Sequence, residues 1–255
     1  MDWVKIAKGL VKVGSMVSEI EREAIEKRKN EFRENAIAVR CREDVSRLMI
    51  GDAVCVVDDF MGIIVSKNGP ECRAIPFIHK RSSTNWYTYQ VYMIPNIRRT
   101  DSSYMNSISH WIITDAKNYD DGKKNQEEIM KYLEREKESR DRHEFPAFEY
   151  CNKMGKGYYL PAISELKTLF ESGNISVIND TLKQYRIDPL IPIEGEISYW
   201  SSTDDVEQKY EGLHNSYSSD SAAYALSVDS NGKIDITLQS KQKDAYVLPF
   251  FVIRF

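Results

Sequence analysis

The chain has 255 residues, of which 42% are hydrophobic and 29% are charged, and its formal net charge is -4. This size allows one large domain or two small ones, each with a buried core. Nucleic-acid binders usually concentrate positive charge, so the near balance of charge argues against that class. No apolar run approaches the roughly 18 residues that a transmembrane helix needs, so we expect no membrane span.

The N-terminal residues are not expected to form a signal peptide, because Lys5, Lys8 and Lys12 interrupt the apolar positions. We therefore expect the protein in the cytoplasm or in a phage particle. The spacing of the four cysteines fits no zinc or redox pattern. Without a signal peptide they are expected to be reduced and to pack as small hydrophobic residues.

Residues 3–27 are predicted to form a helix whose apolar positions follow an a/d pattern over about three heptads. These positions are Trp3, Ile6, Leu10, Val13, Val17, Ile20 and Ala24. Such a stripe can join two copies of the chain into a homo-oligomer, pack on its own domain, or lie on a membrane surface. The predicted organisation is an N-terminal helical region, 1–46, followed by one domain, 47–255.

The sequence becomes β-rich after about residue 46 and then alternates strands with helices. Strands are predicted at 53–57, 61–66, 72–78, 85–94 and 110–114, and helices at 123–140 and 144–154. The unit Leu160-Pro161 predicts a corner from strand to helix, because proline fixes φ and opens a helix without needing a donor. In the helix that follows, Glu165 is expected on the wet face and Leu166 on the buried face.

Strands dominate the last third of the chain. A strand is predicted at 197–203, and residues 222–240 alternate around a "DSNG" turn, which is typical of a β-hairpin. The apolar run 245–255 predicts a strand that is buried on both faces, with Pro249 at a bulge or at the end of a ladder.

Several short motifs then occur in a characteristic order: "DGKKN", "AFEYCNKMGKG", "YYLPAISEL", "YWSST", "NGK" and a terminal "FVIRF". In this order they resemble bacterial domains of C-type-lectin fold related to the C-terminal domain of Lcl, a collagen-like adhesin. The resemblance covers roughly residues 51–255. It departs from the family at Tyr159, where tryptophan is usual, and at Val247 with Leu248, which replace a Val-Arg pair.

The resemblance implies an α+β, C-type-lectin-like fold in which the N- and C-terminal strands pair, here 53–65 with 246–255. The predicted core residues are Leu160, Pro161, Leu166 and Trp200. Large aromatic side chains mostly serve packing, so Trp200 is expected to anchor the core beside Leu160 and Leu166.

Candidate chemistry is sparse. No calcium-binding motif of the C-type lectins occurs, and the carboxylates of "NYDD" and "TDDVEQ" are interpreted as solvated loop charge, so no metal or cofactor is expected. Formylglycine-generating enzymes share this broad fold and use a pair of cysteines, whereas Cys151 has no second cysteine near it. We therefore expect no enzymatic activity. The basic and aromatic stretch 79–89 could stack nucleic-acid bases, but its alternation favours sheet packing.

Residues 199–224 contain four tyrosines, six serines, one asparagine and one glycine, the residue types enriched in antibody paratopes. The predicted binding face combines this loop with the strand that returns after it. Its residues are Tyr210, His214, Asn215, Tyr217, Thr237, Gln239 and Lys241. Because side chains alternate along a strand, the last three share one face, opposite Ile236 and Leu238.

These features favour a non-enzymatic, calcium-independent adhesin or display protein that binds a protein or glycan ligand and no nucleic acid. The fold also resembles that of diversified variable proteins of bacteria and phages. The alternatives are a relative of the formylglycine-generating enzymes and a structural component of a virion or surface assembly.

Overall fold

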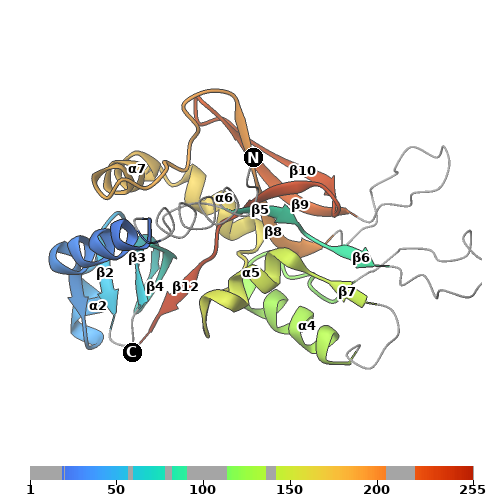
Figure 1. Ribbon diagram of the computed structural model, residues 1–255, viewed down its shortest axis with the longest axis horizontal. Helices are drawn as coiled ribbons and strands as arrows, with labels where there is room; N and C mark the ends of the chain where they lie inside the picture. Colours follow the sequence, from blue (N-terminus) through green and yellow to red (C-terminus); the bar gives the residue numbers. More distant parts are fainter. Residues whose placement is uncertain are drawn as a thin grey trace, which may run out of the picture.

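Two five-stranded β-sheets, a small two-stranded sheet and the helices that cover them form the described part of the chain (Figure 1). The computed structural model describes residues 19, 21–56, 60–77, 82–90, 114–135, 142–204 and 222–254. The fold is α+β, as the sequence predicts. None of the helices in these ranges is long and apolar enough to cross a membrane.

Sheet A has five strands in the order β1-β2-β3-β4-β12. Their bounds are β1 (Ile37–Val39), β2 (Ala53–Val56), β3 (Phe60–Asn68), β4 (Glu71–Pro76) and β12 (Phe251–Ile253). The three strands predicted between residues 53 and 78 are therefore confirmed as β2, β3 and β4. They pair antiparallel along the chain, as expected for strands joined by short turns.

Sheet B also has five strands, in the order β10-β9-β8-β11-β5. Their bounds are β5 (Ser82–Asn85), β8 (Glu196–Asp204), β9 (Ala222–Asp229), β10 (Ile234–Ser240) and β11 (Asp244–Val247). The predicted hairpin is confirmed as β9 and β10, and β10 lies at the edge of the sheet. A separate two-stranded sheet pairs β6 (Thr88–Gln90) with β7 (Arg142–Glu144).

The C-terminal run changes sheets at Pro249, because β11 belongs to sheet B and β12 to sheet A. The expectation that this proline ends a ladder is confirmed. The predicted strand pairing is corrected, since β12 pairs with β4, Phe251 opposite Ala74, and not with residues 53–65. The earlier strands and the C-terminal strand nevertheless share sheet A.

The helices have the bounds α2 (Arg42–Arg47), α4 (Gly122–Arg135), α5 (Pro146–Met154), α6 (Ile163–Glu171) and α7 (Ile175–Gln184), and a further helix covers residues 21–35. The helices predicted at 123–140 and 144–154 are confirmed as α4 and α5. In Figure 1, α4 and α5 lie along one side of sheet B, and α6 lies between the two sheets. Helices α2 and α7 were not predicted.

Residues 21–46 of the N-terminal region are part of the folded unit. Phe32 of helix 21–35 is fully buried, and its ring centroid lies 4.7 Å from that of Phe77 and 4.6 Å from that of Tyr185. Strand β1 follows directly and pairs in parallel with β2. A domain boundary after residue 46 would therefore cut through sheet A. Of the predicted a/d positions only Ala24 lies within the described residues, and it is exposed.

Three apolar clusters fill the interior. The first joins sheet A to α6, α7 and one face of sheet B, the second joins sheet B to α4 and α5, and the third covers the other face of sheet A. Leu160, Pro161, Leu166 and Trp200 are all buried, as predicted. Trp200 shares the second cluster with Leu160, but Leu166 belongs to the first, because Leu160 and Leu166 flank the corner on opposite sides.

The strand predicted at 85–94 is shorter and divided. Strand β5 ends at Asn85, and the amides of Trp86 and Tyr87 then donate to the carbonyl of Lys241, at 3.0 and 3.1 Å. The rings of Trp86 and Tyr87 are buried against Phe145, so packing has overridden the alternation. The strand predicted at 110–114 lies outside the described residues except for Thr114.

Candidate functional site

The Leu-Pro corner is organised by a buried carboxylate. Glu165 is only 8% exposed, so the expectation that it lies on the wet face of α6 is wrong. Its Oε2 accepts hydrogen bonds from the amide of Ala162, at 2.8 Å, and from the amide of Gly122, at 3.0 Å. One side chain thereby caps the N-termini of both α6 and α4, where amides lack partners within the helix.

The other oxygen, Oε1, accepts a hydrogen bond from the Tyr159 hydroxyl at 3.0 Å and pairs with Arg73 Nε at 2.8 Å. Burial raises the pKa of Glu165, and this effect outweighs the lowering by the amide of Ala162 and by Arg73. Burial also raises the pKa of Tyr159. Since both groups are enclosed by the corner itself, we interpret them as structural and not as catalytic.

The serines of "YWSST" are also structural. Ser201, Ser202 and Thr203 are fully buried. Ser201 Oγ donates to the carbonyl of Tyr224 at 2.7 Å, and Thr203 Oγ1 donates to the carbonyl of Asn118 at 3.1 Å. Residues 201–203, which belong to the first part of the paratope-like stretch, therefore bond sheet B to the segment around Asn118 and are not exposed to a ligand.

The returning strand β10 presents part of the predicted face. Thr237 and Gln239 are partly exposed on one face, and Gln239 Nε2 lies 3.4 Å from Thr237 Oγ1. Lys241 was expected to point outward too, but it is 1% exposed, because it pairs with the buried carboxylate of Asp204. Ile236 was expected inside, but it is 36% exposed, because β10 is an edge strand.

The four predicted loop residues, Tyr210, His214, Asn215 and Tyr217, lie outside the described residues. The loop that carries them joins two adjacent strands. It leaves β8 at Asp204 and enters β9 at Ala222, and Asp204 lies opposite Ala223 in the ladder. The two ends of the loop are therefore close together at one end of sheet B.

A pair of tyrosines lies at this end of sheet B, and the sequence did not predict that they would meet. The rings of Tyr119 and Tyr224 lie 5.4 Å apart at an angle of 58°, and the Tyr119 hydroxyl donates to the Tyr224 hydroxyl at 2.8 Å. Tyr119 is 36% exposed and Tyr224 is partly exposed. Leu238 lies opposite Tyr224 on β10, next but one to Ile236.

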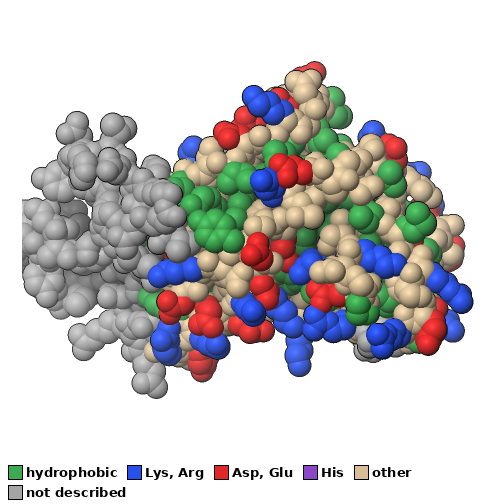
Figure 2. Space-filling model, turned by 180° about the vertical axis from the view of Figure 1, so that it is seen from behind, with side chains coloured by type: hydrophobic (Ala, Val, Ile, Leu, Met, Phe, Trp, Pro, Cys, Tyr) green, Lys and Arg blue, Asp and Glu red, His purple; other side chains and the backbone are tan. Residues whose placement is uncertain are grey.

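We call these four residues, Tyr119, Tyr224, Ile236 and Leu238, the tyrosine surface. The alternation of β9 indicated which face Tyr224 occupies, but nothing local in the sequence brings Tyr119 to it. Figure 2 shows that apolar side chains gather in one area of the rear face, whereas Lys, Arg, Asp and Glu are intermixed along its lower part.

All four cysteines are free: Cys72 and Cys151 are buried, Cys55 is partly buried, and Cys41 is exposed, so the expectation that the cysteines pack as small hydrophobic residues is wrong for Cys41. Cys151 is fully buried, and burial raises the pKa of its thiol, whereas the thiolate is the nucleophilic form. Within the described ranges, no group of three or more His, Cys, Asp or Glu side chains is arranged to hold a metal ion.

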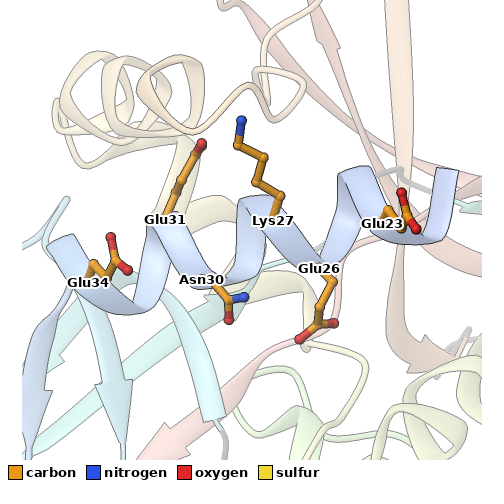
Figure 3. Close-up of a pocket in the computed structure, with 6 residues that line it drawn as sticks. All are labelled: Glu23, Glu26, Lys27, Asn30, Glu31 and Glu34. Carbon is orange, nitrogen blue, oxygen red and sulfur yellow. The ribbon is translucent and has the colours of Figure 1, made fainter. Parts of the chain in front are cut away.

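A hollow beside helix 21–35 is lined by Glu23, Glu26, Lys27, Asn30, Glu31 and Glu34. Figure 3 shows that Lys27 and Glu31 extend to one side of the helix and Glu26 and Asn30 to the other. All six side chains are exposed. Because they belong to one helix and diverge, they do not form a binding site.

No family model, no curated protein and no solved structure matches the chain. The likeness to C-type-lectin-fold domains therefore rests on the order of the sequence motifs.

Proposed function

We propose that the chain is a non-enzymatic, calcium-independent binding protein of C-type-lectin-like fold, an adhesin or display protein that holds a protein or glycan ligand at the loop end of sheet B. The observation that carries this proposal is the contact between the exposed Tyr119 and the partly exposed Tyr224. The diversified origin suggested by the sequence resemblance belongs to the same proposal.

Tyrosine pairs suit such a role for physical reasons. A tyrosine offers a large, rigid contact area at low entropic cost and a hydroxyl that can bond to a polar ligand. Here a hydrogen bond between the two hydroxyls already joins the rings before any ligand arrives. A preorganised surface loses less entropy on binding than a flexible one.

Neighbouring residues extend the surface in two directions. Ile236 and Leu238 add partly exposed apolar area on the same face of the hairpin. Thr237 and Gln239 add polar groups on its other face. The loop residues Tyr210, His214, Asn215 and Tyr217 enter the proposal through their sequence alone, which is rich in paratope-like residue types.

The rival activity, a thiol enzyme of formylglycine-generating type, would require a reactive cysteine. Cys151 lies fully buried between α5 and sheet B, in surroundings that favour the protonated thiol. This burial supports binding over thiol catalysis.

The experiment screens the protein against a glycan array and a displayed peptide library, and then titrates Tyr119→Ala and Tyr224→Ala with the best ligand. Each variant should weaken binding by more than about 1 kcal/mol, roughly fivefold in Kd. Tyr246→Ala is the matched control, because Tyr246 is also 36% exposed but lies on β11. Chelator should leave the affinity unchanged.

Wild-type affinity in both tyrosine variants would place the binding site elsewhere. A loss of affinity in chelator would show that a metal takes part. Either result would contradict the proposal.

Self-association through the predicted N-terminal seam is a second part of the proposal. Its last position, Ala24, is exposed, while Phe32 of the same helix packs on the domain. Sedimentation of the full chain and of a variant that lacks residues 1–18 tests this part, since the deletion leaves Phe32 and β1 in place. Equal oligomeric states would contradict self-association.

A further inference from the structure

A buried ion pair lies at the end of sheet B where strand β8 ends, at Asp204. Lys241 Nζ lies 2.5 Å from Asp204 Oδ1, and the two side chains are 1% and 3% exposed. Asp204 is the last residue of β8, and Lys241 is the first residue after β10. Burying two charges costs a large desolvation energy, so such a pair is weak evidence for stability and raises the question of what it positions.

Asp204 holds a segment that has no regular structure of its own. Its Oδ2 accepts hydrogen bonds from the amide of Thr114, at 2.9 Å, and from the hydroxyl of Thr114, at 2.7 Å. Its own amide donates to the carbonyl of Ala116 at 2.8 Å. These three bonds fix the segment that leads from Thr114 to Tyr119 against the end of β8.

The same aspartate is linked to the second tyrosine. In the ladder Asp204 lies opposite Ala223, the residue before Tyr224. Asp204 is therefore bonded to the segment that carries Tyr119 and paired with the strand that carries Tyr224. We therefore expect a shift of Asp204 to change the separation of the two rings.

Lys241 is itself held firmly. Its Nζ lies 4.5 Å from the centroid of the Trp86 ring, a cation–π geometry. Its carbonyl accepts hydrogen bonds from the amides of Trp86 and Tyr87. The lysine thus gives Asp204 a partner at a fixed place, and a charged, directional pair specifies one geometry where apolar packing would allow several.

We propose that Asp204 and Lys241 are positioning residues of the tyrosine surface, whose ion pair sets the separation and orientation of Tyr119 and Tyr224. This inference deepens the proposed function and rests on it for its biological meaning. Its structural content, the link between the ion pair and the ring geometry, is testable without a ligand.

The test measures photo-oxidative dityrosine formation between Tyr119 and Tyr224, quantified by mass spectrometry of the cross-linked peptides. Asp204→Asn and Lys241→Met should reduce the yield several-fold at a temperature at which circular dichroism shows each variant folded. Thr114→Val keeps the ion pair and the amide bond but removes the hydroxyl donor, so it should give a smaller reduction. Thr114→Val also tests the proposal if Asp204→Asn and Lys241→Met do not fold.

Val45→Ala is the control for general destabilisation, because Val45 is buried in the third apolar cluster, which contains neither tyrosine. It should lower the melting temperature and leave the cross-link yield unchanged. A wild-type yield in folded Lys241→Met and Thr114→Val would overturn the proposal. An equal fall in Val45→Ala would overturn it too, since general destabilisation would then explain the effect.

The outcome also separates this inference from the proposed function. If the yield falls in Lys241→Met but Tyr119→Ala binds the ligand normally, the positioning role holds and the binding site is elsewhere. If Tyr119→Ala loses affinity but the yield does not respond to Lys241→Met, the binding site holds and the positioning role fails.

Discussion

The hydroxyl of Tyr159 donates a hydrogen bond to Oε1 of Glu165, 3.0 Å away, inside the corner that leads from the Leu-Pro unit into α6. This contact explains why the motif carries an aromatic residue at one end and a glutamate at the other. Pro161 turns the chain, and the glutamate then reaches back to cap two helices and to accept a hydrogen bond from the tyrosine hydroxyl. The hydrogen-bonding groups of Tyr159, Ala162 and Glu165 therefore satisfy one another within the corner.

Replacing Tyr159 by Phe should lower the unfolding free energy by about 1.5–3 kcal/mol, the range for hydrogen bonds to charged groups. Tyr199→Phe is the matched control, because its buried hydroxyl donates to the carbonyl of Leu190, a neutral acceptor, at 2.8 Å. It should cost about 0.5–1.5 kcal/mol. Urea unfolding measures both. An equal loss of unfolding free energy in the two variants would show that a charged acceptor makes this hydrogen bond no stronger than a neutral one does.

Glu165 should make stability depend on pH in a specific direction. Burial raises its pKa above the value in the unfolded chain, so the folded state binds the proton more tightly. The stabilisation that protonated Glu165 gives to the folded state is fully present below its pKa in the unfolded chain and is lost as the pH rises through its pKa in the folded state. The stability of the wild type relative to Glu165→Gln should therefore decrease with rising pH, starting near about pH 4.

Urea unfolding of both proteins across this range measures the difference, which cancels the contributions of the other carboxylates. A difference that grows with pH would mean that Arg73 and the two amides stabilise the ionised form more strongly than burial opposes it.

Gly122 should not tolerate a side chain. A Cβ at this position would lie 2.4 Å from the carbonyl oxygen of Leu160 and 2.5 Å from the amide nitrogen of Ala162, both backbone atoms of the corner. Gly122→Ala should therefore destabilise the protein by about 1–3 kcal/mol, as overpacking does. Thermal unfolding checks this. A higher melting temperature, as for Gly→Ala in an open helix, would show that the corner does not press on α4.

The N-terminal region should be needed for the stability of the domain. Phe32→Ala should cost about 3–5 kcal/mol, the range for buried phenylalanine, while Glu34→Ala on the exposed side of the helix should cost little. Deletion of residues 1–45 also removes β1 and should cost more than Phe32→Ala alone. A truncated chain with the melting temperature of the full chain would contradict the packing of helix 21–35 and β1 on the domain.

Local sequence patterns were sufficient to predict the hairpin, strands β2, β3 and β4 of sheet A, and helices α4, α5 and α6. Tertiary pairings were less predictable. Glu165 was predicted to lie on the solvent-exposed face of its helix, because its partners, Arg73 and Gly122, are distant in sequence. Lys241 looked exposed by alternation, yet the turn after β10 carries it to Asp204. Ionic partners that meet only in the folded chain leave no local signal.

The tyrosine surface shows the same limit. Tyr224 could be placed on a face of β9 from its spacing to Leu226, but Tyr119 stands in a stretch, "NYDD", that reads as solvated loop charge. The carbonyl of Tyr119 accepts a hydrogen bond from the amide of Ser164, and Asp204 holds the segment that precedes Tyr119. These partners are distant in sequence, so only the folded chain places the two tyrosines together.

The most direct test of the binding proposal is an amide hydrogen-exchange footprint of the wild-type protein with and without the ligand found in the array or display screen. The account predicts slower exchange on ligand binding in residues 116–120 and in β9 and β10, with helix α5 and β12 unchanged. Protection confined to helix 21–35 or to α5, with none at Tyr119, β9 or β10, would contradict it.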